Sequence, residues 1–243
     1  MQKSILFLIL LLLTSVLNHA QDIMVVNDKN AELRIASGFH GIQVSHAIDL
    51  VIKQGNEEAV VVSAIDEKYR NRIKTEVKNG ILRIWFDNDG LKWNWNMGDK
   101  KLRAYVSVKN IDNIQASGAC DIKIDGTLNG TELKLNLSGA SSFKGNINYT
   151  RMIADQSGAS DVNISGNVTE LKVSVSGASD FKGFELLTET CVADASGASD
   201  IKITVNKDLK VQASGASDVD YKGNAVVSKF STSGASSVRK RSR

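Results

Sequence analysis

Apolar and polar residues alternate along much of the second half of the chain. In segment 133–137, leucines occupy every second position and polar residues lie between them, and segment 171–175 repeats the pattern with leucine and valine. A period of two predicts β-strands that have one buried face and one exposed face.

A five-residue phrase, Ser-Gly-Ala-Ser-Asp or a close variant, follows these alternating segments and occurs seven times. Its glycines are Gly118, Gly139, Gly158, Gly177, Gly197, Gly215 and Gly234, which lie 18 to 21 residues apart. A repeat this short and regular is typical of a solenoid, in which each repeat forms one coil that stacks on the last.

Each coil is predicted to run as a strand, a bend at the phrase, and a second short strand. The residue four positions after each glycine is always apolar: Ile122, Phe143, Val162, Phe181, Ile201, Val219 and Val238. Glycine at the bend suits a positive φ or a close backbone approach, and the following alanine suits a tight inward corner. Serines and aspartates are expected at the corner or on the outside, with the aspartates at Asp121, Asp161, Asp180, Asp200 and Asp218.

These patterns predict an all-β protein, a single-stranded right-handed parallel β-helix of about 19 residues per coil with a β-rich N-terminal cap. Like residues would stack at the strand spacing of about 4.8 Å, and the hand follows from the crossover rule for parallel strands. Proline is absent, which suits backbone N–H groups that are committed to ladders.

The N-terminus has the features of a signal peptide over residues 1–20. Lys3 precedes an apolar run, Ile5–Leu13, that is too short to span a bilayer. We expect an exported mature chain without a transmembrane segment, in the periplasm, on the outer-membrane surface or secreted. Residues 21–110 are predicted to form a β-rich part continuous with the solenoid, and residues 111–243 to form the repeat β-helix.

The N-terminal part contains strand signals of its own, joined by short turns that favour some antiparallel pairing. Strands are expected at Ala59–Ala64, Ile73–Val77, Ile81–Phe86 and Leu102–Val108, with a helical turn within Asp66–Arg72. Ser45–Leu50 fits the repeat phrase with His46 at the glycine position, and we interpret it as an early, diverged copy.

The charge balance, 30 basic against 27 acidic residues, gives no indication of a nucleic-acid partner. Basic residues cluster only in the C-terminal tail, at Arg239, Lys240, Arg241 and Arg243. A charged tail suits the end of a solenoid, because it opposes edge-to-edge pairing of the last strands. Binding of the tail to a phosphate-rich surface is the alternative.

Candidate chemistry is sparse, and we expect no enzyme, no cofactor and no metal site. His40 and His46 lack a neighbouring nucleophile motif, and Cys/His spacings typical of metal ligands do not occur. Stacked aspartates repel one another and could attract calcium. However, basic or polar residues that can offset this charge follow the acidic position, at Lys123, Lys144, Asn163, Lys182 and Lys202. We favour aspartates and serines that cap the bend through backbone hydrogen bonds.

The two cysteines are expected to remain unpaired within one chain. Cys120 replaces a corner serine, and Cys191 falls on an inward strand position. They are nearly four coils apart, roughly 17–19 Å at the stacking distance, whereas a disulfide needs Cα atoms about 5.5 Å apart. Cys120 is expected to be free, with a bridge between chains as the alternative.

Trp93 and Trp95 lie in a loop rich in Asn, Asp and Gly, and two residues apart they would share one face of a strand. They are candidates for an aromatic platform that binds a sugar or a protein. The alternative, which we favour, is that they fold back and cover the end of the core.

The repeated phrase, with Gly38–Val44 and Asp49–Gly55, resembles the head GIN domain family of exported bacterial auto-transporter adhesin heads. The resemblance implies a parallel β-helix, a cell-surface or periplasmic location and a role in adhesion. It implies no catalytic residues.

Together, these observations predict an exported cell-envelope protein, an adhesin-like module that presents a repetitive Ser/Asp surface to a glycan or to an envelope or host protein. A structural envelope protein without a specific ligand is the first alternative. A β-helix enzyme that acts on polysaccharide is the second, since sugar lyases use this fold, although a fold does not determine a function. The sequence leaves the oligomeric state open.

Overall fold

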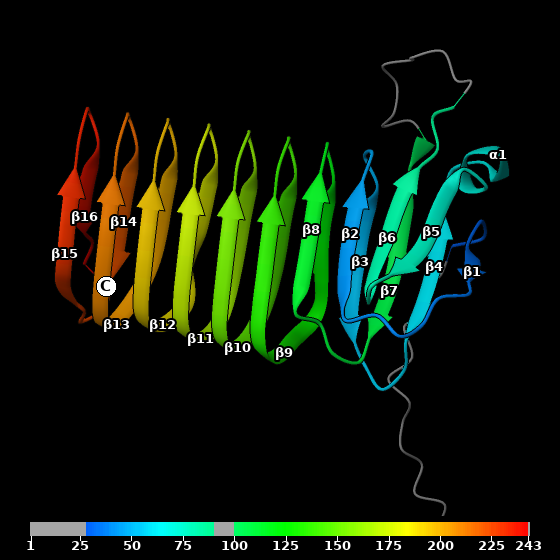
Figure 1. Cartoon of the computed structure of the whole chain (residues 1–243), viewed down its shortest axis with the longest axis horizontal. Helices are drawn as coiled ribbons and strands as arrows, with labels where there is room; N and C mark the ends of the chain where they lie inside the picture. The colour runs from blue at the N-terminus through cyan, green and yellow to red at the C-terminus, as the bar shows by residue number, and fades with distance from the viewer. Residues whose placement is uncertain (1–27, 90–99, 243) are drawn as a thin grey trace, which may run out of the picture.

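The computed structural model describes residues 28–89 and 100–242, and most of them lie in strands (Figure 1). Of these described residues, 66% are in strands and 2% in a helix, and they form a parallel β-solenoid of about seven turns, with about 19 residues per coil. The predicted all-β parallel solenoid is therefore confirmed. The elements are β1 (Glu32–Arg34), β2 (Gly41–Ser45), β3 (Asp49–Gln54), β4 (Ala59–Ser63), α1 (Glu67–Arg70), β5 (Ile73–Lys78), β6 (Ile81–Phe86), β7 (Arg103–Val108), β8 (Asn113–Ser117), β9 (Asp121–Leu137), β10 (Ser142–Gln156), β11 (Asp161–Val175), β12 (Asp180–Ala195), β13 (Asp200–Ala213), β14 (Asp218–Lys222), β15 (Val226–Thr232) and β16 (Ser237–Lys240).

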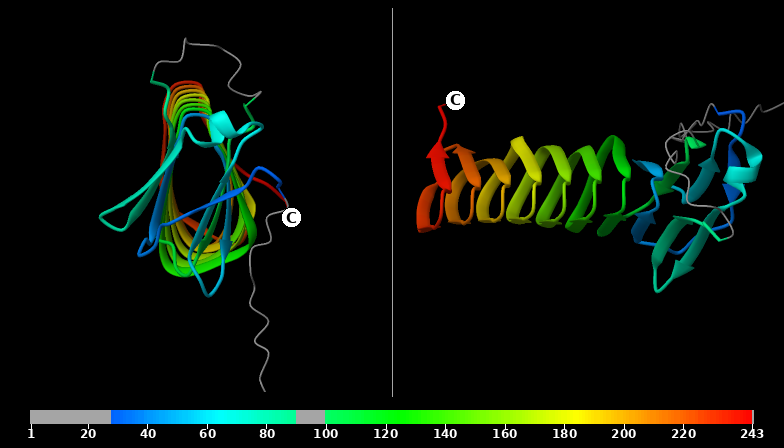
Figure 2. Two further views of the ribbon diagram at one scale, coloured as in Figure 1. Left: turned by 90° about the vertical axis from the view of Figure 1, so that its right-hand side faces the viewer. Right: turned by 90° about the horizontal axis from the view of Figure 1, so that it is seen from above.

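Five long strands, β9 to β13, form the body of the solenoid. They wrap round the core and pair in parallel with their neighbours, so that Phe143 of β10 is in register with Ile122 of β9 and Val162 of β11. The coils nest one behind another around a single elongated core (Figure 2). Like positions therefore form columns that run along the solenoid axis.

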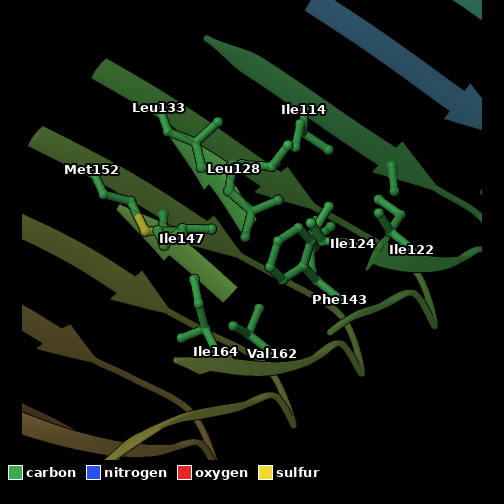
Figure 3. Close-up of a cluster of buried hydrophobic side chains, with 14 of the residues drawn as sticks. Ile114, Ile122, Ile124, Leu128, Leu133, Phe143, Ile147, Met152, Val162 and Ile164 are labelled. Atoms are coloured by element: carbon green, nitrogen blue, oxygen red, sulfur yellow. The ribbon is translucent and has the colours of Figure 1, made fainter. Parts of the chain in front are cut away.

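The inner columns are apolar and buried. Phe143 and Phe181 are 1% and 0% exposed, and Leu133, Leu135 and Leu137 are at most 2% exposed. Figure 3 shows side chains from successive coils that point into one continuous core. Each fully buried side chain of this kind stabilises the fold by roughly 1.5–3 kcal/mol relative to an exposed position. The predicted inward positions are confirmed.

The bend requires glycine for two reasons. Gly177 has a φ of +80°, and a Cβ atom on it would lie 2.4 Å from the carbonyl oxygen of Gly158 in the preceding coil. Ala178 N donates to that same oxygen at 2.8 Å, so neighbouring bends approach as closely as paired strands do. His46 stands at the head of this column with a φ of +65°. Its Cβ is tolerated because no glycine of the column precedes it.

The second serine of the phrase points into the solenoid. Ser160 is 1% exposed and Ser179 is fully buried, and the hydroxyl of Ser160 donates to the carbonyl oxygen of Ser157 at 2.7 Å. The alanine before it, such as Ala159, lies at the exposed tip of the bend. The prediction of an inward alanine is therefore wrong. The inner side of the turn is occupied by a hydroxyl that bonds a backbone carbonyl, which alanine cannot do.

Cys120 takes the place of this inward serine, and its Sγ lies 3.4 Å from the carbonyl oxygen of Ser117. Cys120 and Cys191 are both free, and they are 0% and 2% exposed. Burial raises the pKa of both thiols, which keeps them protonated and unreactive. The inward position predicted for Cys191 is confirmed, and the burial of Cys120 leaves no exposed sulfur for a bridge between chains.

The first coil is built from N-terminal elements. β2 and β3 stack on β8 and β9, with Ser45 in register with Ser117 and Leu50 with Ile122. The segment between β2 and β3 is therefore a coil bend, as its similarity to the repeat phrase predicts.

Other N-terminal elements lie beyond this coil and cover one end of the solenoid (Figure 1). The pairs β1–β4, β4–β7 and β5–β6 are antiparallel, as the short turns predict. The helical turn α1 begins after Asp66, whose side chain accepts a hydrogen bond from Lys68 N.

At the opposite end, two arginines hold the last strand to the coil before it. Arg239 Nε and Arg241 Nη2 donate to the carboxylate of Asp220 at 3.0 and 2.9 Å. Burial pushes the pKa of Asp220 upward, but the hydrogen bonds from Arg241 and Arg239 hold it below its ordinary value. Hydrogen bonds from Ser237 and Arg239 lower the pKa of Asp218 as well. We refer to Asp218, Asp220, Arg239 and Arg241 as the arginine clasp.

The arginine clasp is expected to stabilise the last coil at neutral pH and to lose this effect in acid. A carboxyl with a lowered folded pKa contributes stability above its unfolded pKa of about 3.9, and the contribution is lost as the pH falls through the folded pKa. Arg241→Gln should therefore lower the melting temperature at neutral pH and change little in strong acid. The control Lys240→Gln, beside the clasp, should show no such dependence. Equal pH dependence of both variants would contradict the assignment.

Candidate functional site

A groove of about 810 Å³ crosses the face of the solenoid that precedes the bend. Its lining residues come from β2, from β8 and from the C-terminal parts of β9 to β13, so it spans consecutive coils. Its volume lies within the range of about 300–1,000 Å³ that is usual for ligand pockets. Because the coils repeat, each one contributes the same positions to the groove.

Seven groove residues form one column, which we call the polar column: Gln43, Gln115, Asn136, Asp155, Ser174, Asp194 and Gln212. Consecutive members are parallel partners in register, as Gln115 is with Asn136 and Ser174 is with Asp194. The strand alternation directs these side chains outward, because residues beside them such as Leu137 point into the core. Neighbouring members are about 4.8 Å apart along the axis.

The first serines of six of the seven phrases form the edge of the groove beside the bend: Ser117, Ser138, Ser157, Ser176, Ser196 and Ser214. The hydroxyls of Ser138 and Ser176 donate to carbonyl oxygens of the preceding coil, at 3.3 and 3.1 Å. Their oxygen atoms can still accept hydrogen bonds. This edge therefore offers acceptors next to the polar column.

Most of the polar column is not engaged by the protein. Gln115 donates to Asn113 Oδ1 at 3.2 Å. Within residues 28–89 and 100–242, by contrast, no hydrogen bond or ion pair holds the side chains of Asn136, Asp155, Asp194 and Gln212. Carboxylates accept hydrogen bonds, and amides both donate and accept them. The groove thus presents a row of donors and acceptors that have no partner in the described chain.

These groups suit hydrogen bonding to a ligand. The residue types that line the groove are Gln, Asn, Asp, Ser, Ala, Leu and Val, and none is a histidine or lysine that could activate a serine. Across the described ranges, no group of three or more His, Cys, Asp or Glu side chains is placed to hold a metal ion.

A profile of the family described as "Putative auto-transporter adhesin, head GIN domain" matches residues 38–225, which is more than half of the chain. The chain belongs to the head GIN domain family. The matched residues include β2 to β14 and therefore every residue that lines the groove. No curated protein sequence matches this head GIN domain.

Solved structures share the fold of this head GIN domain at low sequence identity. A "putative adhesin" from Bacteroides fragilis has a TM-score of 0.77 and 17% identity, and the match covers 88% of this chain and 98% of that one. A "Putative lipid binding protein" from Parabacteroides distasonis has a TM-score of 0.66 and 18% identity, with coverages of 88% and 98%. A "putative adhesin" from Parabacteroides distasonis has the same TM-score and identity, with coverages of 87% and 96%. At such identities the likeness concerns the fold alone.

Membership of an adhesin family favours an exported protein. The predicted signal peptide, residues 1–20, lies outside the described residues. In the part of this head GIN domain that the structure describes, no helix is long and apolar enough to cross a membrane.

The aspartates predicted from the phrase lie on the other side of the bend from the groove. Lys182 Nζ lies 3.0 Å from a carboxylate oxygen of Asp161 and 3.1 Å from one of Asp180, which is the charge offset that the sequence predicts. Ser142 of the second copy of the phrase donates to Asp121 Oδ1 of the first copy at 2.5 Å. Together with the arginine clasp, these contacts engage four aspartates of the head GIN domain, Asp121, Asp161, Asp180 and Asp218, whereas Asp200 has no side-chain hydrogen bond or ion pair within the described residues.

Trp93 and Trp95 lie outside the described residues, so their role as an aromatic platform stays a prediction.

The polar column is absent from the site residues predicted above, although the sequence carries a signal for it. The residue two positions before the first serine of each phrase is Gln, Asn, Asp or Ser in every coil of the groove. The outward position two residues earlier instead carries Lys134, Lys172 and Lys210 in alternate coils. The restriction to short, uncharged or acidic groups is therefore specific to the polar column and not general to exposed strand positions of the head GIN domain.

Proposed function

We propose that this head GIN domain is the binding part of an exported adhesin, and that its groove binds an extended glycan. The polar column carries the proposal, because it repeats amide, carboxylate and hydroxyl groups once per coil and most of them have no partner in the described chain. Sugar hydroxyls both donate and accept hydrogen bonds, so they complement these groups. The description of the family as adhesins supports a binding role.

The spacing of the column supports a ligand that lies along the solenoid axis. Successive members of the polar column are about 4.8 Å apart, which is similar to the advance of one sugar ring along an extended polysaccharide. A linear glycan in the groove would place successive sugars over successive coils. Each hydrogen bond would contribute modestly, about 0.5–1.5 kcal/mol, and their repetition would provide the affinity.

A peptide partner suits the groove less well. Extended peptides commonly bind by adding a strand to an open sheet edge, where unpaired backbone groups are available. The groove instead lies over strands such as β10, β11 and β12, which are paired on both sides. Side-chain groups are what this surface offers, and these are the groups that polyhydroxyl ligands use.

A second candidate function is that of an enzyme that acts on polysaccharide, because the groove contains two carboxylates, Asp155 and Asp194. They are two coils apart, about 9.6 Å, which is close to the carboxyl separation of about 6.5–9.5 Å in inverting glycosidases. In those enzymes, however, the two carboxyls flank the scissile bond from opposite sides. Asp155 and Asp194 project from one column toward the same side of a bound chain, which favours binding over hydrolysis.

The proposal is tested by screening the protein on a glycan array and then measuring the affinity of groove variants for a glycan that binds. Asp194→Ala and Asn136→Ala should each weaken binding, by about ten-fold for the carboxylate, since hydrogen bonds to charged groups are the stronger ones. The matched controls Asp200→Ala and Asn163→Ala remove the same groups from the other side of the bend and should not change the affinity. Equal losses in both pairs, or no glycan binding by the unaltered protein, would contradict the proposal. Shortened glycan products would indicate an enzyme instead.

A further inference from the structure

The last coil has an open end within the described chain. Among the described strands, β15 pairs only with β13, and β16 pairs only with β14. Figures 1 and 2 show no described element stacked beyond these two strands, whereas β1, β4 and α1 lie over the other end. The outer edges of β15 and β16 therefore carry backbone N–H and C=O groups that are available for pairing. We call this surface the end face.

The end face also exposes the apolar core. Phe230 is in register with Val211, a core residue that is only 2% exposed, yet Phe230 itself is 58% exposed. Val227 on the same strand is in register with the core residue Leu209 and packs against the core, but it is only partly buried. In any inner coil, the next strand would cover these positions. The end face thus combines unpaired backbone with apolar side chains, which are the two features that an added strand recognises.

The charge around the end face is positive. Residues 218–242 contain five basic side chains and two acidic ones, and both acidic side chains belong to the arginine clasp. Lys229 on β15 and Lys240 on β16 have no ion pair within the described ranges. A second copy that approached with its own end face would bring these positive charges together. An acidic strand would be attracted to them.

The arginine clasp orders β16, which is one of the two strands of the end face. It fixes β16 against β14, and Arg241 N donates to the carbonyl oxygen of Tyr221 at 2.8 Å, which extends the ladder beyond β16. An end coil in which β16 is already ordered loses less conformational freedom when an added strand pairs with the neighbouring β15.

We propose that the end face binds an extended strand from another protein, in which apolar residues alternate with acidic ones. The apolar residues would cover Phe230 and Val227, the backbone would pair with β15, and the acidic residues would lie near Lys229. This inference rests on the end of the solenoid and is independent of the groove.

The test uses the full chain and a soluble probe: a capped peptide as long as β15, seven residues, in which valine and glutamate alternate. Fluorescence anisotropy should detect binding of this peptide and little binding of the matched valine–lysine peptide. Lys229→Glu should weaken binding of the glutamate peptide by about ten-fold or more and favour the lysine peptide. Phe230→Ser should weaken both, and circular dichroism should confirm that both variants fold.

Lys172→Glu is the control for this test, because Lys172 is exposed in the same column as Lys229 but lies three coils away. It should leave binding of the glutamate peptide unchanged. Equal affinity for both peptides, or binding of neither, would overturn the proposal. A dimer in light scattering that Phe230→Ser abolishes would also overturn it, because the end face would then bind a second copy. Groove variants such as Asp194→Ala should not affect any of these measurements.

Discussion

Replacing Gly177 by alanine is expected to destabilise the solenoid by about 3 kcal/mol or more, a large part of the stability of an ordinary domain. Gly177 has a φ of +80°, where a residue with a side chain is strained, and its Cβ would meet the carbonyl oxygen of Gly158 at 2.4 Å. That oxygen accepts the hydrogen bond from Ala178 N, so it cannot move away without breaking the ladder. Urea unfolding followed by circular dichroism measures the loss.

Gly38→Ala is the matched control for this substitution. Gly38 also has a positive φ, +74°, but a Cβ on it would meet no atom within 4 Å. The control therefore carries the conformational strain without the collision, and it should cost only about 1–2 kcal/mol. A similar loss for both variants would show that the close approach of successive bends is not what requires glycine.

Phe181→Ala is expected to cost about 3–5 kcal/mol, because it leaves a cavity in a core that cannot collapse around it. Phe181 is 0% exposed, and its ring lies beside Gly183, where a Cβ would be 2.7 Å from Phe181 Cε1. Phe181 thus fills the space that a side chain at position 183 would otherwise occupy. Thermal and urea unfolding should both report the loss.

Leu187→Ala in the same strand is the control for the core prediction. Leu187 is 49% exposed, so its truncation should cost less than about 1 kcal/mol. If Phe181→Ala proved as mild as this control, the core of the solenoid would have to be more adaptable than the close packing of protein interiors allows.

The two faces beside the bend differ in how much the protein uses them. On the side that follows the bend, Lys182 bridges Asp161 and Asp180, and Ser142 donates to Asp121. These aspartates are engaged within the chain, although Asp200 on the same side has no side-chain hydrogen bond or ion pair in the described residues. On the groove side, the polar column stays largely unengaged, and this contrast is why we place ligand binding there.

The sequence predicts the structure of one coil well because every coil needs the same buried positions and the same tight bend. Alternation assigns Leu133, Leu135 and Leu137 to the core, and a glycine at a fixed interval marks a bend where a Cβ would collide with the preceding coil. The early copy at Ser45–Leu50 is recognisable for the same reason, since its pattern of inward residues survives the change of glycine to His46.

The interior of the bend is harder to predict. Small size suggests that the alanine faces inward, but the left-handed glycine turns the chain so that the alanine lies at the tip and the next serine points in. The deciding factor is the hydrogen bond from that serine, as from Ser160 to the carbonyl of Ser157, and a size argument does not include it. The burial of Cys120 follows from the same geometry.

The groove can be predicted only in part. Its residue types are visible in the sequence as the polar column, but its depth depends on how far the flanking strands curve. A register shift, such as the one between Asn163 and Ser165 where β11 pairs with β12, appears in the sequence only as a one-residue change in the spacing of the phrase glycines. The repeated Ser-Asp pair therefore favours the more obvious aspartate column, which lies on the other face.

The most direct measurement is a titration with oligosaccharides of increasing length, taken from a glycan that the array identifies. If the groove binds an extended chain along the solenoid axis, affinity should rise with each added sugar and level off near the number of coils that line the groove. Asp194→Ala should weaken the long oligosaccharides more than the short ones that do not reach it. Full affinity at the shortest length, with no effect of Asp194→Ala at any length, would contradict binding along the groove.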